Sequence, residues 1–401
     1  MRKQINTKVS TWLALGLLPL SGLATDVYIP SMPAMANDLH ASNLQIQLTL
    51  GIFIISYGIT QLFIGSLLDS YGRYPFSLVS LLVFMASNVF IASSETVEFI
   101  YAMRILQGIS VAIIVVSKRA YFIDVFSGNR LAHYLSMFTI IWSAGPIFAP
   151  FIGGFLEERF SWRANFYFLA IYAVIVILLE VIYGGETIRS RSKFNFSNIL
   201  NTYRGMLMTT DFTSGISMLC FAYSMIMVYN LTGAFILERA FSQSPVVIGK
   251  CSLILGIAWL TGGLLGRATI KVSFLKKMMA NTGLQFLLSF LMMAIIFYSA
   301  NLLVMMGFAF LIHAAAGYTY NNYFGYCLSR FPSNAGIAGG LTGGVVNMIM
   351  FLITFFIVSY LPAPTAQSLS FAYLVLSSCS LILFIFIRRG KQSKNQLNLK
   401  A

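Results

Sequence analysis

The chain has 401 residues, of which 58% are hydrophobic and only 9% are charged, and its mean hydropathy is +0.80. Soluble domains carry roughly 25% charged residues, so this composition excludes a soluble protein and predicts an integral membrane protein. The formal net charge is +14. Basic residues gathered on one face of a membrane explain that charge better than a nucleic-acid partner, which we do not expect.

Twelve apolar stretches are long enough to cross a bilayer as helices. A membrane helix needs about 20 apolar residues to span a hydrocarbon core of about 30 Å, whereas the strands of a membrane barrel would alternate over about 10 residues. The predicted spans are 11–33, 45–68, 75–94, 97–117, 131–156, 164–184, 212–236, 245–266, 278–299, 301–328, 334–361 and 368–387.

Basic residues are shared unequally between the two sides of these spans. With the N-terminus inside, most of the 26 Lys and Arg residues fall in inner segments, and the outer segments hold only Arg159, Arg163, Arg239 and Lys250. Cytoplasmic loops carry an excess of Lys and Arg. We therefore expect an even number of spans and both termini in the cytoplasm.

The first span ends in TDVYIPSMP, from Thr25 to Pro33, and contains Asp26. An Asp at the centre of a membrane helix costs about 2.5–3.5 kcal/mol on insertion scales. We interpret Asp26 as the only acid well inside the first-half spans, and therefore as a functional residue. The apolar run is too long for a cleaved signal peptide.

The ends of the second and fourth spans carry two short motifs. GSLLDSYGRYP, from Gly65 to Pro75, has glycines that allow a tight turn and places Asp69 four residues before Arg73. RILQG begins at Arg104, which lies about 10 Å inside the membrane, at a depth similar to that of Asp26. A static salt bridge is one reading of this pair. We favour a pair that titrates and responds to substrate.

Gln107 and Gly108 share a helix face with Arg104. Gln107 is then either a donor in a cavity or one partner of a hydrogen bond between helices. The fifth span contains GPIFAPFIGG, from Gly145 to Gly154, and SWRANF follows it.

The longest polar segment, GGETIRSRSKFNFSNILNTYRG, runs from Gly184 to Gly205 and divides six spans from six. We predict an all-α integral membrane fold whose twelve transmembrane helices form two six-helix pseudo-symmetric halves, as in secondary transporters. The predicted parts are an N-terminal bundle (1–184), a cytoplasmic linker (185–211), a C-terminal bundle (212–390) and a cytoplasmic tail (391–401).

The second half offers weaker signals. Asn230 interrupts the seventh span, either at a bend facing a cavity or in ordinary packing. His313 is either a hydrogen-bonded packing residue or a second proton carrier. Tyr320 and Asn321 belong to YTYNNYFGY, which either lines the inner cavity or lies at the membrane interface. In the eleventh span, glycines spaced by four from Gly336 permit close backbone approach.

No enzyme, metal site or cofactor is expected. The four cysteines fall inside predicted spans without the spacing of metal ligands, and they are interpreted as small buried hydrophobic residues. The sequence contains no nucleophile elbow and no phosphate-binding glycine loop. Energy for any transport is therefore expected from a proton gradient.

The motifs between Thr25 and Phe166, in this order, resemble those of the major facilitator superfamily, and TDVYIPSMP looks like the first-helix signature of its Bcr/CflA branch of drug:proton antiporters. The resemblance implies proton coupling by Asp26 and Arg104, and a meeting of the second and eleventh helices at an inner gate. Its implied inner-gate residues are Gly65, Asp69, Gly72, Arg73 and Asp124, and its implied antiporter-motif residues are Gly145, Pro146, Pro150, Gly153 and Gly154.

Several positions depart from the family pattern. Ser70 and Tyr74 stand where basic residues are usual, Ile141 replaces a glycine, and Leu18 stands where some relatives have a second acid. The resemblance implies a monomer in a bacterial inner membrane that exports drugs or other amphipathic small molecules in exchange for protons. The alternatives are a dedicated exporter of one metabolite, such as a siderophore, sugar or amino acid, and a proton-coupled importer. The sequence does not name the substrate.

Overall fold

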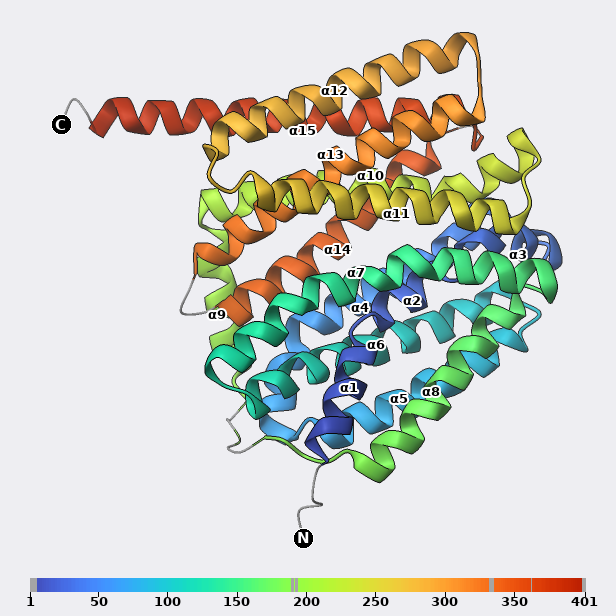
Figure 1. Cartoon of the computed structure of the whole chain (residues 1–401), viewed down its shortest axis with the longest axis vertical. Coiled ribbons are helices and arrows are strands. Elements are labelled where there is room, and N and C mark those ends of the chain that lie inside the picture. The colour runs from blue at the N-terminus through green and yellow to red at the C-terminus, as the bar shows by residue number, and fades with distance from the viewer. Residues whose placement is uncertain (1–5, 189–190, 192–193, 332–334, 362, 399–401) are drawn as a thin grey trace. The chain divides into compact units, whose positions relative to one another are not determined.

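A computed structural model describes residues 6–188, 191, 194–331, 335–361 and 363–398. Within these residues the backbone forms helices and no strands (Figure 1). The helices are α1 (Thr7–Leu17), α2 (Leu20–Asp26), the 3₁₀ helix η1 (Ile29–Ser31), α3 (Met32–Asp38), α4 (Asn43–Tyr71), α5 (Tyr74–Ala92), α6 (Val97–Val125), α7 (Gly128–Arg159), α8 (Arg163–Tyr183), α9 (Phe196–Leu207), α10 (Thr210–Phe241), α11 (Pro245–Ala268), α12 (Phe274–Tyr298), α13 (Leu302–Ser329), α14 (Ala335–Ser359) and α15 (Ala366–Asn398).

Eleven helical stretches of the described chain are long and apolar enough to cross a membrane, and the first of them combines α1 to α3. The 32-residue helix α7 covers the predicted fifth span as well. The predicted all-α membrane fold is confirmed, and the chain is a multi-pass membrane protein. Residues 391–398 of the predicted tail continue α15.

The predicted first span is not one continuous helix. α1 ends at Leu17, α2 begins after Pro19, and a 3₁₀ turn precedes α3. Proline has no N–H to donate, and Pro30 and Pro33 follow Pro19 along the same segment. The consequence for the site is that Asp26 is the last residue of α2, at a helix terminus, and does not lie within an uninterrupted helix.

The described chain clusters into two compact units. Unit 1 comprises Met1–Leu200 together with Gln243–Leu253 and Gly343–Met348, and unit 2 comprises Asn201–Ser242, Ile254–Thr342 and Ile349–Ala401. The boundary at 200 lies inside the predicted linker. Two short C-terminal segments, one from α11 and one from α14, thus belong to the N-terminal unit.

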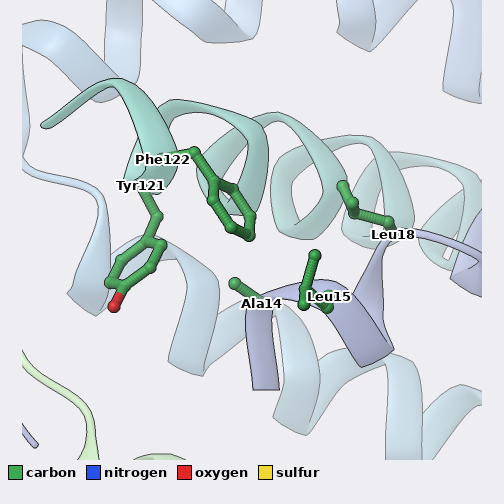
Figure 2. Packing of buried hydrophobic residues seen from close by; sticks show 5 residues of the cluster. All are labelled: Ala14, Leu15, Leu18, Tyr121 and Phe122. Atoms are coloured by element: carbon green, nitrogen blue, oxygen red, sulfur yellow. The ribbon is translucent and has the colours of Figure 1, made fainter. Parts of the chain in front are cut away.

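In unit 1, α1 packs against the end of α6. Figure 2 shows Ala14, Leu15 and Leu18 facing Tyr121 and Phe122, and all five side chains are buried. The Tyr121 hydroxyl also lies 3.1 Å from the Thr11 hydroxyl. These contacts fasten the first helix to α6, the helix that carries Arg104.

A buried ion pair joins α6 to α8. Lys118 Nζ lies 2.5 Å from Glu180 Oε1, and both side chains are largely shielded from solvent. Sequence reasoning named Asp26 as the only acid well inside the first-half spans, and it missed Glu180. Glu180 is one turn from the end of α8, where the chain leaves the apolar run, and its carboxylate stays buried because Lys118 pairs with it.

In unit 2, small residues bring α11 and α13 close together. A side chain on Gly262 would overlap the Ala314 backbone, and one on Gly317 would overlap the Trp259 backbone. Asn281 of α12 donates to the Ala315 carbonyl of α13 at 2.9 Å. Close packing and interhelical hydrogen bonds of this kind associate helices where apolar surface alone gives no preference.

The Lys118–Glu180 pair gives a test of this packing. We expect Glu180→Gln to lower the thermal midpoint of the purified protein, because removing one partner of a buried ion pair costs about 3–5 kcal/mol. The double variant Lys118→Met/Glu180→Leu should recover most of the loss, because no buried charge then remains unpaired. Equal midpoints for wild type and Glu180→Gln would show that the pair does not stabilise unit 1.

Candidate functional site

The most completely buried charge of unit 1 is Arg104 of α6, whose side chain has no exposed surface. Its guanidinium donates from Nε to the Thr49 carbonyl at 3.2 Å and from Nη1 to the Ala24 carbonyl at 3.1 Å. The guanidinium carbon also lies 4.4 Å from the centre of the Tyr28 ring and 4.8 Å from that of Phe53. Carbonyl dipoles and aromatic faces therefore surround the cation.

The Ala24 carbonyl is available because α2 ends two residues later. The last carbonyls of a helix lack partners within the helix and carry the negative end of its dipole. The break in the first span thus creates an acceptor for Arg104, and a neighbouring helix satisfies the freed backbone group.

Gln107 connects the same cation to α5. Its Oε1 accepts from Arg104 Nη1 at 2.8 Å, and its Nε2 donates to Asn88 Oδ1 at 2.9 Å. Asn88 in turn donates to the Phe84 carbonyl at 2.7 Å. Gln107 and Asn88 are both fully buried, so Gln107 has the helix-to-helix hydrogen bond that was one of its two expected roles.

Asp26 lies beside this arrangement. Its side chain is 6% exposed, and it interacts electrostatically with Arg104. Arg104 Nη2 is buried without a hydrogen-bond partner. The two charges are neighbours, as their depths predicted. That the pair titrates and responds to substrate stays a prediction.

The predicted antiporter motif holds α2 in place. A Cβ on Gly145 would lie 2.5 Å from the Pro19 carbonyl oxygen. A Cβ on Gly22 would overlap the Pro146 ring, and a Cβ on Gly153 would overlap the Val27 carbonyl. These contacts leave no room for larger residues. α7 therefore packs directly against the backbone on both sides of Asp26, and Figure 1 shows α2 and α7 side by side.

The motif continues toward the first residues of α11. A side chain on Gly154 would overlap the Pro245 carbonyl, and one on Gly249 would lie 2.5 Å from the Pro150 carbonyl oxygen. Sequence reasoning placed Gly154 and Pro150 in the motif but gave no signal for Gly249, which is an isolated glycine in an apolar run.

A second group of charges, which we call the Arg73 cluster, comprises Asp69, Arg73, Asp124, Glu186 and Thr187. Arg73 Nη2 pairs with Asp69 Oδ1 at 2.7 Å, and Nη1 pairs with Asp124. Thr187 Oγ1 donates to the same Asp124 oxygen at 2.8 Å. The ion pairs expected of Arg73 are thus present, and they connect α4 to α6.

Glu186 completes the Arg73 cluster, and sequence reasoning missed it. Its Oε2 accepts from the backbone N–H of Arg73 at 2.8 Å and of Tyr74 at 3.2 Å. Acids at a helix N-terminus satisfy its free N–H groups, and these two groups begin α5. The available signal was an acid directly after the Gly184–Gly185 pair that ends the sixth span.

Gly72 lets the chain turn between α4 and α5. Its φ of +111° is one that side-chain-bearing residues rarely adopt, and a Cβ there would lie 2.7 Å from Glu186 Oε2. The glycine of the predicted inner-gate motif is therefore required both by the backbone and by the carboxylate that approaches it.

The glycines of α4 and α14 make contact at Gly58. Within unit 1 a Cβ on Gly58 would lie 3.0 Å from the Gly344 carbonyl oxygen, and one on Gly343 would lie 2.9 Å from Gln61 Oε1. Around Gly65, by contrast, a Cβ would have no atom within 4 Å. The close approach that we expected at Gly65 is found two turns earlier in the helix.

The second-half candidates lie in unit 2. His313 is buried, and its Nε2 lies 2.9 Å from the Tyr373 hydroxyl. Asn321 donates to the Gly263 carbonyl at 2.7 Å. Tyr320 and Asn230 are both half-buried, and Tyr320 packs against other aromatic rings.

Comparison with known proteins places these motifs in a family. The family model described as Major Facilitator Superfamily matches residues 15–355. The chain is 30% identical to multidrug resistance protein D of Escherichia coli (strain K12) over 171 residues, 43% of each chain. It is 32% identical to a bicyclomycin resistance protein homolog of Haemophilus influenzae over 193 residues, 47% of this chain and 48% of the relative.

The match to these curated relatives thus spans about half of their length. Among solved structures, the crystal structure of a D-xylose–proton symporter has a TM-score of 0.70 and 15% identity, and the match covers 95% of this chain and 96% of the symporter. At this level of identity the similarity establishes the fold alone.

The contacts of Glu186 predict that it anchors the start of the segment after α8. We expect Glu186→Ala to speed trypsin cleavage after Arg191, because the variant loses both backbone bonds to the N-terminus of α5, at a cost of about 0.5–2 kcal/mol. The rate is followed by mass spectrometry. Glu95→Ala, which removes an exposed acid elsewhere in unit 1, serves as the control. Equal rates in both variants would remove the anchoring role.

Proposed function

Because this chain belongs to the Major Facilitator Superfamily, a family of transporters, we propose that it exports drugs or other amphipathic small molecules in exchange for protons. It moves a small-molecule substrate and is not an enzyme. The substrate class is supported by the names of its relatives, which are resistance proteins. The unequal distribution of basic residues supports both termini in the cytoplasm. The bacterial relatives support an inner-membrane location, and we propose that the protein works as a monomer.

The observation that carries the proposal is the position of Asp26. This buried carboxylate ends α2 beside a buried guanidinium whose hydrogen bonds go to carbonyls and to Gln107. Arginine stays charged throughout the physiological pH range. Arg104 therefore keeps its place and its charge whether Asp26 holds a proton or not, and the net charge of the site changes with Asp26 alone.

Coupling follows from competition. Protonation of Asp26 from the outside neutralises the carboxylate, and substrate that enters from the inside favours release of that proton. Proton binding and substrate binding exclude each other at one site. That site opens to the outside in one state of the protein and to the inside in the other, so the proton gradient drives export. Tight packing of α7 against α2 supports this role, because it fixes the backbone on both sides of Asp26.

The Arg73 cluster and the glycines of α4 supply the proposed inner gate. Asp69 is about half exposed and pairs with Arg73, which is itself shielded. A charge pair with one exposed member exchanges partners at low cost, because water replaces the lost contact. We propose that the space around Gly65 accommodates another helix in a different state of the transport cycle.

Asp26 is tested by substitution. We expect Asp26→Asn, which keeps the shape and removes the titrating group, to abolish both substrate-induced proton release from purified protein and efflux from vesicles with an imposed pH gradient. Asp26→Glu should retain part of the activity with a shifted pH optimum. Arg104→Lys loses the planar fork and should be poorly active.

The paired variant Lys118→Met/Glu180→Leu is the control for this experiment, because it removes the other buried acid of unit 1 together with its partner. It should still release protons. If Asp26→Asn releases protons and pumps against a gradient, the proton carrier lies elsewhere, and His313 becomes the next residue to test. Accumulation of substrate in cells would indicate an importer.

The gate is tested by two glycines of one helix. We expect Gly65→Leu and Asp69→Ala to lower the transport rate while membrane abundance stays near normal. A side chain at Gly65 meets no atom within 4 Å, and Arg73 keeps its pair with Asp124 when Asp69 is lost. Gly58→Leu should instead lower abundance, since it forces α4 away from Gly344. Wild-type transport rates in Gly65→Leu and Asp69→Ala would remove the gate and leave packing alone.

A further inference from the structure

A cavity of about 320 Å³ opens at the connection between α6 and α7, within unit 1. Small-molecule pockets in proteins have volumes of about 300–1,000 Å³, so the cavity is large enough for a small ligand. None of its described lining residues belongs to the Arg104 site or to the Arg73 cluster. The lining residues are Phe126, Asn129, Arg130, His133 and Tyr134.

A short connection shapes the cavity. Only Phe126 and Ser127 join the end of α6 to the start of α7 at Gly128. Gly128 has a φ of +54°, in the left-handed region that glycine adopts most readily. The chain reverses there, and the Tyr134 ring returns to within 4.6 Å of the Phe126 ring and 5.3 Å of the Phe122 ring, measured between ring centres. The Phe126 and Tyr134 rings therefore form an apolar wall of the cavity.

The other lining residues are polar. Asn129, Arg130 and His133 are exposed, whereas the two aromatic residues are half-buried. Spacings of three and four residues put Arg130, His133 and Tyr134 on one face of α7. Among the hydrogen bonds and ion pairs of the described residues, none uses the Arg130 guanidinium. A guanidinium presents five N–H donors in a planar fork that matches a carboxylate or a phosphate, and this fork is available to a ligand.

No acid competes for Arg130 in the described lining of the cavity. The nearest acid along the chain is Asp124. Its carboxylate already pairs with Arg73 and accepts a hydrogen bond from the Thr187 hydroxyl. The cavity thus combines a positive charge, amide and ring nitrogens and an apolar wall, which is the chemistry that suits an anion attached to an apolar group.

The position of the cavity points to phosphate as that anion. The predicted fifth span begins at residue 131, so Arg130 lies where the hydrocarbon core ends and the phospholipid headgroups begin. In the proposed orientation this connection faces the cytoplasm, and the cytoplasmic leaflet carries anionic lipids. Basic pockets between membrane helices bind the headgroups of such lipids. Tyrosine rings are enriched at the same level of the membrane.

We propose that this cavity binds a phosphate group of net negative charge. The Arg130 fork pairs with the phosphate oxygens, the Asn129 amide donates to them, and the Phe126 and Tyr134 rings pack against the carbon skeleton that carries the phosphate. The phosphate comes either from the headgroup of an anionic phospholipid or from a soluble phosphate ester. This site is additional to the proposed transport site, and its occupancy does not depend on what the protein transports or in which direction.

The test is native mass spectrometry of the purified full-length protein in a neutral detergent, titrated with dioleoylphosphatidylglycerol. We expect Arg130→Gln to raise the Kd of the first bound lipid about fivefold, the contribution of one basic residue near a membrane surface. Arg130→Lys should raise the Kd less, because it keeps the charge and loses only the fork. Asn129→Trp fills the cavity without changing the charge, and should raise the Kd as much as Arg130→Gln does.

The matched control is Lys8→Gln, which removes one exposed positive charge of unit 1 from outside the cavity. It should leave the Kd for phosphatidylglycerol within about twofold of wild type. Dioleoylphosphatidylcholine should bind the wild type more weakly, because its choline cation meets no carboxylate in the described lining. Thermal midpoints show whether each variant is folded, and Arg130 and Asn129 are both exposed, so their variants keep the buried packing.

Glycerol 3-phosphate, which has the phosphate without acyl chains, distinguishes the two sources. If it binds the wild type as tightly as the lipid and loses affinity in Arg130→Gln, the phosphate comes from a soluble ester. If it binds more weakly than the lipid, the phosphate is that of a lipid headgroup. The inference is overturned if neither probe binds the wild type, or if Arg130→Gln binds the lipid like Lys8→Gln. It is also overturned if Asn129→Trp binds the lipid like wild type, because the lipid then responds to surface charge and not to the cavity.

Discussion

Unit 1 is organised around the need to neutralise one guanidinium that has no access to water. Burying an isolated ion is far more costly than burying a polar group, so Arg104 requires compensation from every side. A helix terminus supplies the Ala24 carbonyl, α4 supplies the Thr49 carbonyl and the Phe53 ring, and Gln107 connects the cation to α5. The broken first helix is thus a condition for a stable Arg104. Asp26 lies beside the cation and interacts electrostatically with it.

The two charged regions of unit 1 show different solutions to the same electrostatic problem. Around Arg104 the partners are dipoles and ring faces in a fully dry setting, which fixes one arrangement. In the Arg73 cluster the partners are carboxylates, and one of them, on Asp69, is about half exposed. Water is available there to take the place of a lost ion pair. A rigid site and a more readily rearranged charge network therefore coexist in the same six-helix unit, and the buried Lys118–Glu180 pair lies in the helices α6 and α8 beside them.

Much of the fold and of the candidate site could be predicted from the sequence. Hydropathy predicted the spans. Asp26 and Arg104 were identified because a charged side chain inside a membrane costs free energy, and their surroundings make up the candidate site. The Arg73–Asp69 pair was predicted from the motif that runs from Gly65 to Pro75. What the sequence does not disclose are contacts made by ordinary residues at particular distances. Nothing marks Thr49 or Ala24 as acceptors, since every residue has a carbonyl. Glu186 looks like a linker acid, and Glu180 like an acid at a span end, until α5 and α6 are placed against them. Proline positions were visible, but where the helix would actually break depended on the neighbours that stabilise its free groups.

The closure of the Arg73 cluster by Glu186 and Thr187 has a consequence for biosynthesis. The turn between α4 and α5 is made early, yet the carboxylate that satisfies its N–H groups lies more than 100 residues further along the chain. That end of the bundle therefore stays electrostatically incomplete until α8 has been synthesised and the first residues after it have left the ribosome. Proteins are made from the N-terminus and their units fold largely in that order. The Glu186 carboxylate thus satisfies the start of α5 only after the whole of α8 has been synthesised.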